Sequence, residues 1–354
     1  MKATIVLLPG DGIGPEVVAA AELVLTAIAE HYHHSFTLTK HPIGGVALRA
    51  GDPPLPSETR DACVTADAVL LGAVGDPEFD QAPGDRRPES ALLQLRQELG
   101  VFANLRPAKV WPGLEDGSSL KAELITGLDL LIVRELTGGL YYAEPRGRSD
   151  DGLTAFNTMK YSRMEIERIA RIAFESARRR NGLVTSVDKA NVLEVSRFWR
   201  EVVIDIATEY PDVTLEHQLV DSCALLLVTH PQKFDVLLAG NLFGDILSDE
   251  AGAVVGSLGL LPSASVGGKG GLFEPVHGSA PDLAGQDRAN PVATIASAAM
   301  LLRHALKLND EADAIETAIG QTLAAGLRTA DLTQTTAAVS CSQMTRAILD
   351  RLPS

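Results

Sequence analysis

The sequence predicts an α/β fold of two domains, and three observations lead to this prediction. Short apolar runs alternate with stretches of helical periodicity along the chain, which is typical of sheets built on parallel strand pairs. The chain has 354 residues, enough for two globular domains. Hydrophobic residues make up 45% of it, a share that is too high for a disordered chain.

The expected elements follow one another in a regular order. The apolar runs expected as strands are 3–8, 67–74, 128–135, 183–188, 213–220 and 234–240. The stretches expected as helices are 15–30, 88–99, 191–209, 244–257, 291–307, 310–326 and 340–352, with a short helix after 220. Two segments rich in Gly, Pro and Asp, 49–58 and 263–282, are expected as surface loops. The second is long for a simple connector, so it is a candidate for function.

A glycine loop joins the first strand to the first helix in LLPGDGIGPEVVAAAELVL. Gly10, Gly12 and Gly14 alternate, whereas a dinucleotide fingerprint requires G-x-G-x-x-G. Pro15 stands where the third glycine belongs, and Glu16 places a negative charge in the first helical turn, where it would repel a phosphate. The fingerprint is therefore absent. Two interpretations stay open, a plain strand-turn-helix with proline at its first position or a loop whose amides touch a ligand.

Charge and cysteine content restrict the partners and the compartment. The chain has 31 Lys and Arg against 46 Asp and Glu, a net charge of −15, so nucleic acid and anionic membranes are not expected as partners. Cys63, Cys223 and Cys341 are far apart and odd in number, which fits neither a disulfide framework nor a zinc site. No apolar stretch is long enough for a signal peptide or a membrane span. We therefore expect a cytoplasmic protein.

The segment PESALLQLRQELG is expected to form a helix over 89–99, because Pro88 suits its first position and Gly100 suits the position after its end. A 3.6-residue period gives this helix one face formed by Glu89, Leu92, Leu93 and Arg96. Two leucines beside an arginine are unusual for a core face. The alternatives are an amphipathic helix with an arginine at its edge and one wall of a binding site.

Two further arginines lie in extended segments. Arg106 lies in NLRPAK, which the following proline holds extended. Arg134 ends LDLLIVR, at the carboxyl end of an expected strand, where open α/β sheets bind ligands. Guanidinium groups bind carboxylates in bidentate fashion, at roughly 1.5–3 kcal/mol for each charge-assisted contact. If Arg96 converges with them, the three arginines form a pocket for a polycarboxylate.

Lys189 lies between an expected strand and an expected helix, in VTSVDKANVL with Asp188 and Asn191. From this segment alone, a surface charge is the simpler interpretation. The alternative is an amine whose pKa is lowered by neighbouring cations until it can accept a proton.

The segment FDVLLAGNLFGDILSDEAG carries the most specific pattern. Asp245 and Asp249 are four residues apart at the start of an expected helix, so both carboxylates project from one face. They repel each other unless a cation lies between them, although the helix dipole could stabilise one of the two. Ligation by oxygen alone favours Mg²⁺ or Mn²⁺. Asp221, at the end of another expected strand, could supply a third carboxylate.

These segments together resemble the β-decarboxylating dehydrogenases, the family of isopropylmalate, isocitrate and tartrate or D-malate dehydrogenases. The matching segments are LPGDGIGPEV, ALLQLRQELGVFANLRPAK, VRELTGGLYYAEPRG, SVDKANVL, NLFGDILSDEAG, GSLGLLPSAS and EPVHGSAPDLAG followed by ANP. They run in family order from residue 7 to about residue 307, so the resemblance covers nearly the whole chain.

The resemblance implies a two-domain fold that is not the Rossmann fold, with the active site in the cleft between the domains. Residues 1–101 plus 256–354 would form the cofactor-binding domain, flanked at its site by the GDGIG loop. Residues 102–255 would form the second domain, with the dimer interface and the metal site. In this family Lys189 and Asp221 would reach in from the neighbouring subunit, so a homodimer with shared active sites is implied.

The resemblance also implies a role for each candidate residue. The carboxylates of a malate would be held by Arg96, Arg106 and Arg134. The metal, Mg²⁺ or Mn²⁺, would be held by Asp221, Asp245 and Asp249. Lys189 would accept the proton of the C2 hydroxyl as hydride leaves for the nicotinamide. Carbon dioxide would then be lost with charge compensation by the metal, and Tyr141 would protonate the enol carbon, so that the implied catalytic residues are Tyr141, Lys189 and Asp221.

The cofactor implied by the resemblance is NAD. The matching positions are Ile13, Asn191, Glu274, His277, Gly278, Ser279, Ala280, Asp282 and Asn290. The Asp282 carboxylate can accept a hydrogen bond from a ribose 2′-hydroxyl, but it repels a 2′-phosphate. Relatives that prefer NADP carry a lysine-tyrosine pair where this chain has Asp282 and Leu283.

The face formed by Glu89, Leu92 and Leu93 bears on the choice of substrate within the family. Placing the third carboxylate of isocitrate there would cost several kcal/mol, whereas an isopropyl group would gain about 1.5–3 kcal/mol. The expected reaction is therefore NAD-dependent oxidative decarboxylation of (2R,3S)-3-isopropylmalate to 4-methyl-2-oxopentanoate, in leucine biosynthesis. Ser90 departs from the usual isopropylmalate pattern, and oxidation of D-malate, tartrate or isocitrate stays an alternative.

Two other classes of protein fit the sequence less well. A Mg²⁺-dependent hydrolase would use the paired aspartates, but the sequence has no phosphate-specific nest. A carboxylate-binding protein without activity would not need a tyrosine, a lysine and a metal face beside its arginines.

Overall fold

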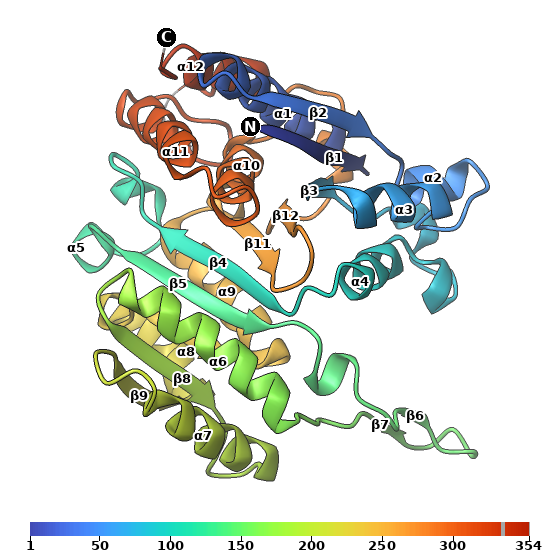
Figure 1. Cartoon of the computed structure of the whole chain (residues 1–354), viewed down its shortest axis with the longest axis vertical. Coiled ribbons are helices and arrows are strands. Elements are labelled where there is room, and N and C mark those ends of the chain that lie inside the picture. The colour runs from blue at the N-terminus through green and yellow to red at the C-terminus, as the bar shows by residue number, and fades with distance from the viewer. Residues whose placement is uncertain (334–336, 354) are drawn as a thin grey trace. The chain divides into compact units, whose positions relative to one another are not determined.

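The computed structural model describes residues 1–333 and 337–353 and divides into two compact units (Figure 1). Unit 1 comprises Met1–Val101, Trp111–Ser118 and Gly256–Ser354, and unit 2 comprises Phe102–Val110 and Ser119–Val255. The sequence placed 111–118 in the second domain, whereas the structure places this segment in unit 1. Trp111 is 6% exposed there, and its ring lies close enough to Gly320 that a Cβ added to this glycine would be 3.7 Å from it. Burial of the indole therefore accounts for the difference.

Unit 1 contains five strands in the order β2-β1-β3-β12-β11. They are β1 (Lys2–Gly10), β2 (Ser35–Lys40), β3 (Ala68–Ala73), β11 (Pro262–Val266) and β12 (Leu272–Pro275). The pairs β1–β2, β1–β3 and β3–β12 are parallel, and β11–β12 is antiparallel. The segment 263–282 was expected as a surface loop, and for these two strands that expectation is wrong. The strands are short and flank the glycine-rich connection 267–271, so the segment resembles a loop although almost all of both strands is buried.

The helices of unit 1 come from both ends of its sequence. They are α1 (Gly14–His31), α2 (Gly45–Arg49), α3 (Ser57–Thr65), α4 (Pro88–Glu98), α10 (Val292–His304), α11 (Asn309–Ala324) and α12 (Cys341–Leu349). Helix α1 packs against α10 and α12, and α10 packs against β11 and β12. The N-terminal strand and helix are thus held by C-terminal helices.

Five of the seven strands of unit 2 lie side by side in the order β4-β5-β10-β8-β9. They are β4 (Ala103–Lys109), β5 (Asp129–Glu135), β8 (Leu183–Asp188), β9 (Thr214–Leu219) and β10 (Val236–Ala239). All neighbours are parallel except β4–β5, so the carboxyl ends of β5, β8, β9 and β10 share one edge. A hairpin of β6 (Gly147–Arg148) and β7 (Ala155–Phe156) extends from the body of this unit (Figure 1).

The helices of unit 2 are α5 (Ala122–Ile125), α6 (Arg163–Arg178), α7 (Glu194–Ala207), α8 (Val220–Thr229) and α9 (Asn241–Val255). Figure 1 shows α6 in front of the sheet and α8 and α9 behind it. Helix α6 was not expected from the sequence, although Ser162 and Glu165 form a capping box at its start. The helices that were expected differ from the structure by a few residues at their ends.

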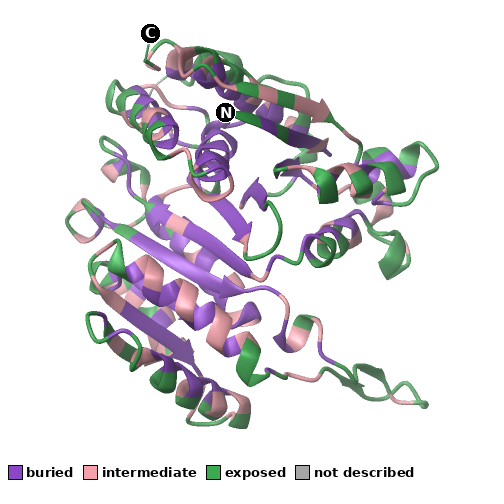
Figure 2. Cartoon of the chain, viewed as in Figure 1, coloured by how far each residue is buried: buried purple, intermediate pink, exposed green. Residues whose placement is uncertain are grey.

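Burial follows the strands of each unit. Figure 2 shows their inner strands almost entirely buried, whereas β2, at the edge of unit 1, alternates between half-buried and exposed residues. Both units therefore have an α/β architecture, as the sequence predicts, with a sheet of mixed direction in each. Within the part of the chain that is described, no helix combines the length and apolar character needed to cross a bilayer.

Candidate functional site

Unit 2 brings two of the predicted arginines to two of the predicted aspartates. Arg134 lies near the carboxyl end of β5, is 3% exposed, and donates from Nε and Nη2 to Oδ1 of Asn241 at 3.0 and 2.7 Å. Its third nitrogen, Nη1, donates to Asp245 on α9. The guanidinium is thus fixed by an amide on one side and bound to a carboxylate on the other.

Arg106 lies on β4 and is held in a similar way. Its Nε donates to Oδ1 of Asn104 at 2.6 Å, and its Nη1 donates to Oγ of Ser248 at 2.6 Å. The same Nη1 lies 3.6 Å from Oδ1 of Asp245 and 3.7 Å from Oδ1 of Asp249. A buried cation therefore stands beside both carboxylates.

Asp245 and Asp249 do not owe their position to the end of the helix. Helix α9 begins at Asn241, so Asp245 lies one turn and Asp249 two turns inside it, whereas dipole stabilisation is confined to the first turn. Burial raises the pKa of Asp249, and Asp245 raises it further, while Arg106 lowers it. The pair thus repels itself as expected and is held together by arginines.

Tyr141 joins this group, which we call the carboxylate cluster: Arg106, Arg134, Tyr141, Asp245 and Asp249. The Tyr141 hydroxyl donates to Oδ2 of Asp245 at 2.8 Å, and the guanidinium carbon of Arg134 lies 5.8 Å from its ring centre. Burial and the bond to Asp245 both raise the pKa of Tyr141. Its phenol therefore keeps its proton at neutral pH.

Lys189 and Asp221 form a separate pair at the same edge of the sheet. Lys189 follows β8 and Asp221 lies in the first turn of α8, with Nζ and Oδ1 2.6 Å apart. This bond lowers the pKa of Asp221. The closest charged partner of Lys189 is thus a carboxylate. The alternative that the sequence left open, an amine whose pKa is lowered, required neighbouring cations instead. Asn191, two residues further on, lines a cavity of about 600 Å³ with Ser222.

A single chain does not assemble the three predicted metal ligands. Among the described residues, only Glu16, Asp287 and Cys341 bring three potential ligand atoms within 4.8 Å of one another. Asp221 is therefore apart from Asp245 and Asp249 in one subunit, and the expectation that it serves a neighbouring subunit stays a prediction.

The third arginine lies in unit 1. Arg96 on α4 is 8% exposed and donates from Nη2 to Oε1 of Glu274 at 2.9 Å. Its Nε is also buried but has no hydrogen-bond partner in the described structure. Such a group is costly to leave unsatisfied, so Arg96 is a candidate to receive an anion.

Leu92 and Leu93 of α4 do not belong to the core. Ala91 and Leu95 are fully buried and form its core face, whereas Leu93 is 40% exposed, Leu92 is half-buried and Glu89 is exposed. The face of Glu89, Leu92 and Leu93 is therefore not the core face of α4, and its role as one wall of a binding site stays a prediction. Two features therefore lie one helical turn apart on α4. One is the unused Nε donor of Arg96, and the other is the apolar surface of Leu92 and Leu93.

A cavity of unit 1 is lined by three of the nine predicted cofactor positions, Ile13, His277 and Asn290. It has a volume of about 320 Å³ and is lined by Ile13, Ser257, Gly259, His277, Leu283, Arg288, Ala289, Asn290, Ala330 and Asp331. The opening glycine loop reaches the same region, because the amide of Ile13 donates to Ser279 O at 2.8 Å. A Cβ on Gly12 would lie 1.9 Å from that oxygen, so only glycine fits there.

His277 presents an acceptor in this cavity. Its Nδ1 lies 2.9 Å from the carbonyl oxygen of Gly278; a carbonyl can only accept, so Nδ1 carries the proton. Burial lowers the pKa of His277, and its Nε2 is buried with no hydrogen-bond partner in the described structure. Ala280 has a left-handed backbone (φ 39°) just before Asp282, whose side chain is exposed.

Several site residues were not expected from the sequence. Asn241, Asn104 and Ser248 hold the two arginines of unit 2; the signal for two of them lay in NLFGDILSDEAG, where polar residues stand one turn on either side of Asp245. Asp331 was also not expected, yet it lines the cavity and accepts from Nδ2 of Asn290 at 3.0 Å. No local pattern marks it, because its partners are distant in sequence.

Comparisons with known proteins agree with these features. A family model described as isocitrate/isopropylmalate dehydrogenase matches residues 4–348. A protein of Prochlorococcus marinus named 3-isopropylmalate dehydrogenase is 55% identical, over 98% of this chain and 99% of that protein. One of Salinibacter ruber with the same name is 60% identical, over 92% and 88%.

Solved structures of the same kind are similar throughout. An isocitrate dehydrogenase from Methylococcus capsulatus matches with a TM-score of 0.88 at 37% identity, over 99% of both chains. A β-decarboxylating dehydrogenase from Thermococcus kodakarensis matches with a TM-score of 0.81 at 36% identity, over 99% of this chain and 96% of the other. The resemblance seen in the sequence is thereby confirmed, and the chain belongs to the isocitrate/isopropylmalate dehydrogenase family.

Proposed function

We propose that the chain catalyses the NAD-dependent oxidative decarboxylation of (2R,3S)-3-isopropylmalate to 4-methyl-2-oxopentanoate, as a cytoplasmic enzyme of leucine biosynthesis. The observation that carries the choice of substrate is the surface of α4. Arg96 offers a buried donor that lacks a partner, and Leu92 and Leu93 lie outside the core on the same helix. A carboxylate with a neighbouring isopropyl group matches this combination.

The three arginines would hold the substrate carboxylates. Arg106 and Arg134 are fixed by neutral amide and hydroxyl groups on one side, which orients each guanidinium before a ligand arrives. A preorganised cation loses less entropy on binding than a mobile one.

Asp245 and Asp249, with Asp221 of a second subunit, would hold the divalent metal. The fit is chemical, because a cluster whose available ligand atoms are carboxylate oxygens suits Mg²⁺ or Mn²⁺. Burial is the main cause of the raised pKa of Asp249, and Asp245 raises it further, so a cation between the two carboxylates would relieve their repulsion. When bound, such a metal supplies Lewis-acid polarisation of the substrate oxygens.

Lys189 and Tyr141 would move the protons. Lys189 is hydrogen-bonded to Asp221. If Asp221 lies in the active site of the neighbouring subunit, Lys189 lies there too. Lys189 would then accept the proton of the C2 hydroxyl. Tyr141 retains its proton because its pKa is raised, so it can deliver one to the product carbon after loss of CO₂.

The cavity of unit 1 would bind NAD, which accepts the hydride. The buried Nε2 of His277 would supply a hydrogen-bond acceptor for the nucleotide, and the exposed Asp282 carboxylate could accept from a ribose hydroxyl. The implied Glu274, Gly278, Ser279 and Ala280 lie next to these groups in sequence, and Asn191 would come from the second subunit.

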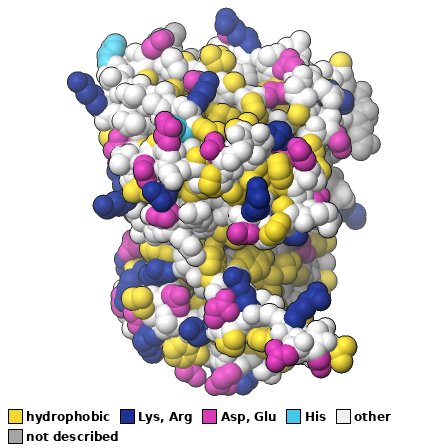
Figure 3. All heavy atoms as spheres, turned by 90° about the vertical axis from the view of Figure 1, so that its right-hand side faces the viewer, with side chains coloured by type: hydrophobic (Ala, Val, Ile, Leu, Met, Phe, Trp, Pro, Cys, Tyr) yellow, Lys and Arg dark blue, Asp and Glu magenta, His cyan; other side chains and the backbone are white. Residues whose placement is uncertain are grey.

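We also propose a homodimer. Leu225 and Val228 on α8 are 64% and 39% exposed, and Ile246 on α9 is 55% exposed. These helices pack against each other and carry Asp221 and the Asp245–Asp249 pair. Covering this apolar surface with a second copy would stabilise the assembly. Acidic and basic side chains and apolar patches are interspersed on the face in Figure 3.

The test compares kcat/KM for 3-isopropylmalate, isocitrate and D-malate with NAD and Mg²⁺. The formation of NADH is monitored by its absorbance. We expect 3-isopropylmalate to be preferred and EDTA to abolish the reaction. A preference for isocitrate or D-malate would contradict the substrate, and turnover unaffected by EDTA would contradict the metal.

A further inference from the structure

Glu16 is the residue whose charge sets the opening loop apart from a dinucleotide fingerprint, and its contacts show a different role. It lies in the first turn of α1. Its Oε1 accepts from the amide of Ala289 at 2.9 Å, and its Oε2 accepts from the amide of Asp287 at 3.2 Å. Each carboxylate oxygen thus satisfies one backbone donor of the segment 287–291, which we call the cavity turn.

The cavity turn has a conformation that needs support. Asp287 has a left-handed backbone with φ 56°, which costs free energy for a residue other than glycine. Three residues later, Asn290 accepts from the amide of Val292 at 3.1 Å and donates to Asp331 at 3.0 Å. Glu16 therefore fixes one end of the turn while Asp331 fixes the other.

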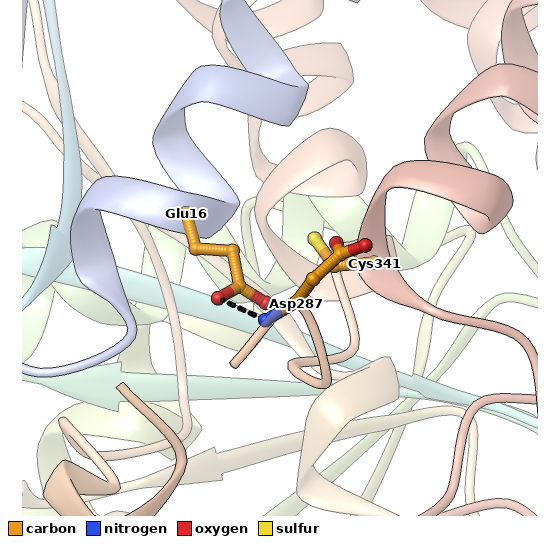
Figure 4. Close-up of side chains that lie close together, drawn as sticks. All are labelled: Glu16, Asp287 and Cys341. Atoms are coloured by element: carbon orange, nitrogen blue, oxygen red, sulfur yellow. Dashed lines mark hydrogen bonds between the residues drawn. The ribbon is translucent and has the colours of Figure 1, made fainter. Parts of the chain in front are cut away.

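Helix α12 also fixes Asp287, on the other side from Glu16 (Figure 4). The amide of Ser342 donates to Oδ1 of Asp287 at 2.7 Å, and its hydroxyl donates to Oδ2 at 2.6 Å. The Cys341 amide donates to the Asp287 carbonyl at 3.0 Å. Because every oxygen of the two carboxylates already has a donor, this group is a structural tie rather than a metal site.

Cys341 completes the tie as a neutral donor. It is 2% exposed, and burial with the nearby acids raises the pKa of its thiol to about 12. The thiol therefore stays protonated and can donate to Glu16. The tie joins α1, the cavity turn and α12, all within unit 1.

The tied turn is part of the cavity wall. Arg288, Ala289 and Asn290 line the 320 Å³ cavity, and Ala289 packs with Ile13 and Val17 of the α1 segment. We propose that Glu16 is a positioning residue for nucleotide binding, which holds the cavity turn in the shape that accepts the cofactor. This inference rests on the proposed function, because it takes NAD as the ligand of the cavity.

The affinity would depend on Glu16 through the population of the competent turn. If loss of the carboxylate leaves the turn in its binding shape about one tenth of the time, the apparent Kd rises about tenfold. Groups that act only after the cofactor is bound lie in unit 2, so kcat should change little.

The experiment compares Glu16→Ala, Glu16→Gln and the control Glu30→Ala, which removes an exposed glutamate from the last turn of the same helix. NADH binding is followed by fluorescence, and amide exchange of 287–290 is measured without nucleotide. We expect Glu16→Ala to raise the Kd for NADH and the KM for NAD about tenfold and to speed exchange in the turn. Glu16→Gln should be intermediate, because its amide oxygen can still accept from Ala289. Glu30→Ala should match wild type.

The outcomes separate the inference from the proposed function. If wild type binds NADH and Glu16→Ala binds it equally well, the positioning role is wrong and the proposed function stands. If wild type binds no NADH, the proposed function fails and the inference falls with it. Should Glu16→Ala not fold, Glu16→Gln decides, since an unchanged Kd and unchanged exchange in that variant also refute the role.

Discussion

Shortening Leu93 tests whether the exposed surface of α4 selects the substrate. Leu93→Ala removes an apolar side chain that is 40% exposed, whereas the core face of the helix, Ala91 and Leu95, stays intact. The change therefore separates binding from folding. Substitutions at surface positions usually alter stability by about 0.5 kcal/mol or less.

The expected magnitude follows from the exposed fraction. Full burial of a leucine contributes about 1.5–3 kcal/mol, so covering the 40% of Leu93 that is open contributes about 0.6–1.2 kcal/mol. At 1.36 kcal/mol for each factor of ten, the loss in kcat/KM for 3-isopropylmalate is about 3- to 8-fold. D-malate has no isopropyl group and should lose less than about twofold on the same basis.

The assay measures initial NADH formation with both substrates for wild type, Leu93→Ala and Leu23→Ala. Leu23 is an exposed leucine on α1, so its variant controls for the loss of a surface leucine elsewhere in the same unit. Melting temperatures of the three proteins should agree closely. An equal loss on both substrates, or a loss in the Leu23 variant as well, would refute the reasoning.

Three further predictions concern the metal, the cofactor and the assembly. Asp245→Asn should lower kcat by about 100-fold, since Lewis-acid stabilisation supplies several kcal/mol, with circular dichroism unchanged; near-normal turnover would contradict the metal assignment. The pKa of His277 is lowered from 6.5, so its ring is neutral above that pH and the Kd for NADH should be constant there. In more acid solution the ring gains a proton and one hydrogen bond to the nucleotide is lost, so the Kd should rise about fivefold. A Kd that does not change with pH would disprove the role of Nε2. Leu225→Glu should place a charge in the apolar surface and give a monomer in analytical ultracentrifugation with little activity, and a fully active dimer would show that the interface lies elsewhere.

The sequence predicts those parts of the site in which local spacing decides geometry. The start and end of α4 follow from Pro88 and Gly100, and Gly100 has the left-handed backbone expected after a helix end. The common direction of Asp245 and Asp249 follows from helical periodicity. The resemblance to a family added roles that no spacing contains, among them that of Tyr141.

Other features depend on contacts between distant segments, which a single sequence does not reveal. Strands β11 and β12 pack against the helix α10, and they flank the glycine-rich connection 267–271, so the whole segment resembles a loop until that helix is placed. The roles of Asp331 and Glu16 depend on their contacts with the cavity turn. Asp331 is 41 residues from its partner in the turn, and Glu16 is 271 residues from its partner. The burial of Trp111, which assigns 111–118 to unit 1, likewise depends on a helix some 200 residues later.

The division of unit 1 between both ends of the polypeptide has a consequence for biosynthesis. As the ribosome delivers the chain, β1, α1 and β3 emerge first, but β12, α10 and α12, against which they pack, appear only after all of unit 2. Unit 2 has its own core and can fold while translation continues. The nascent N-terminal segment must wait with apolar strands uncovered, so this stretch is where a chaperone would be needed most, and where slower elongation would do most harm.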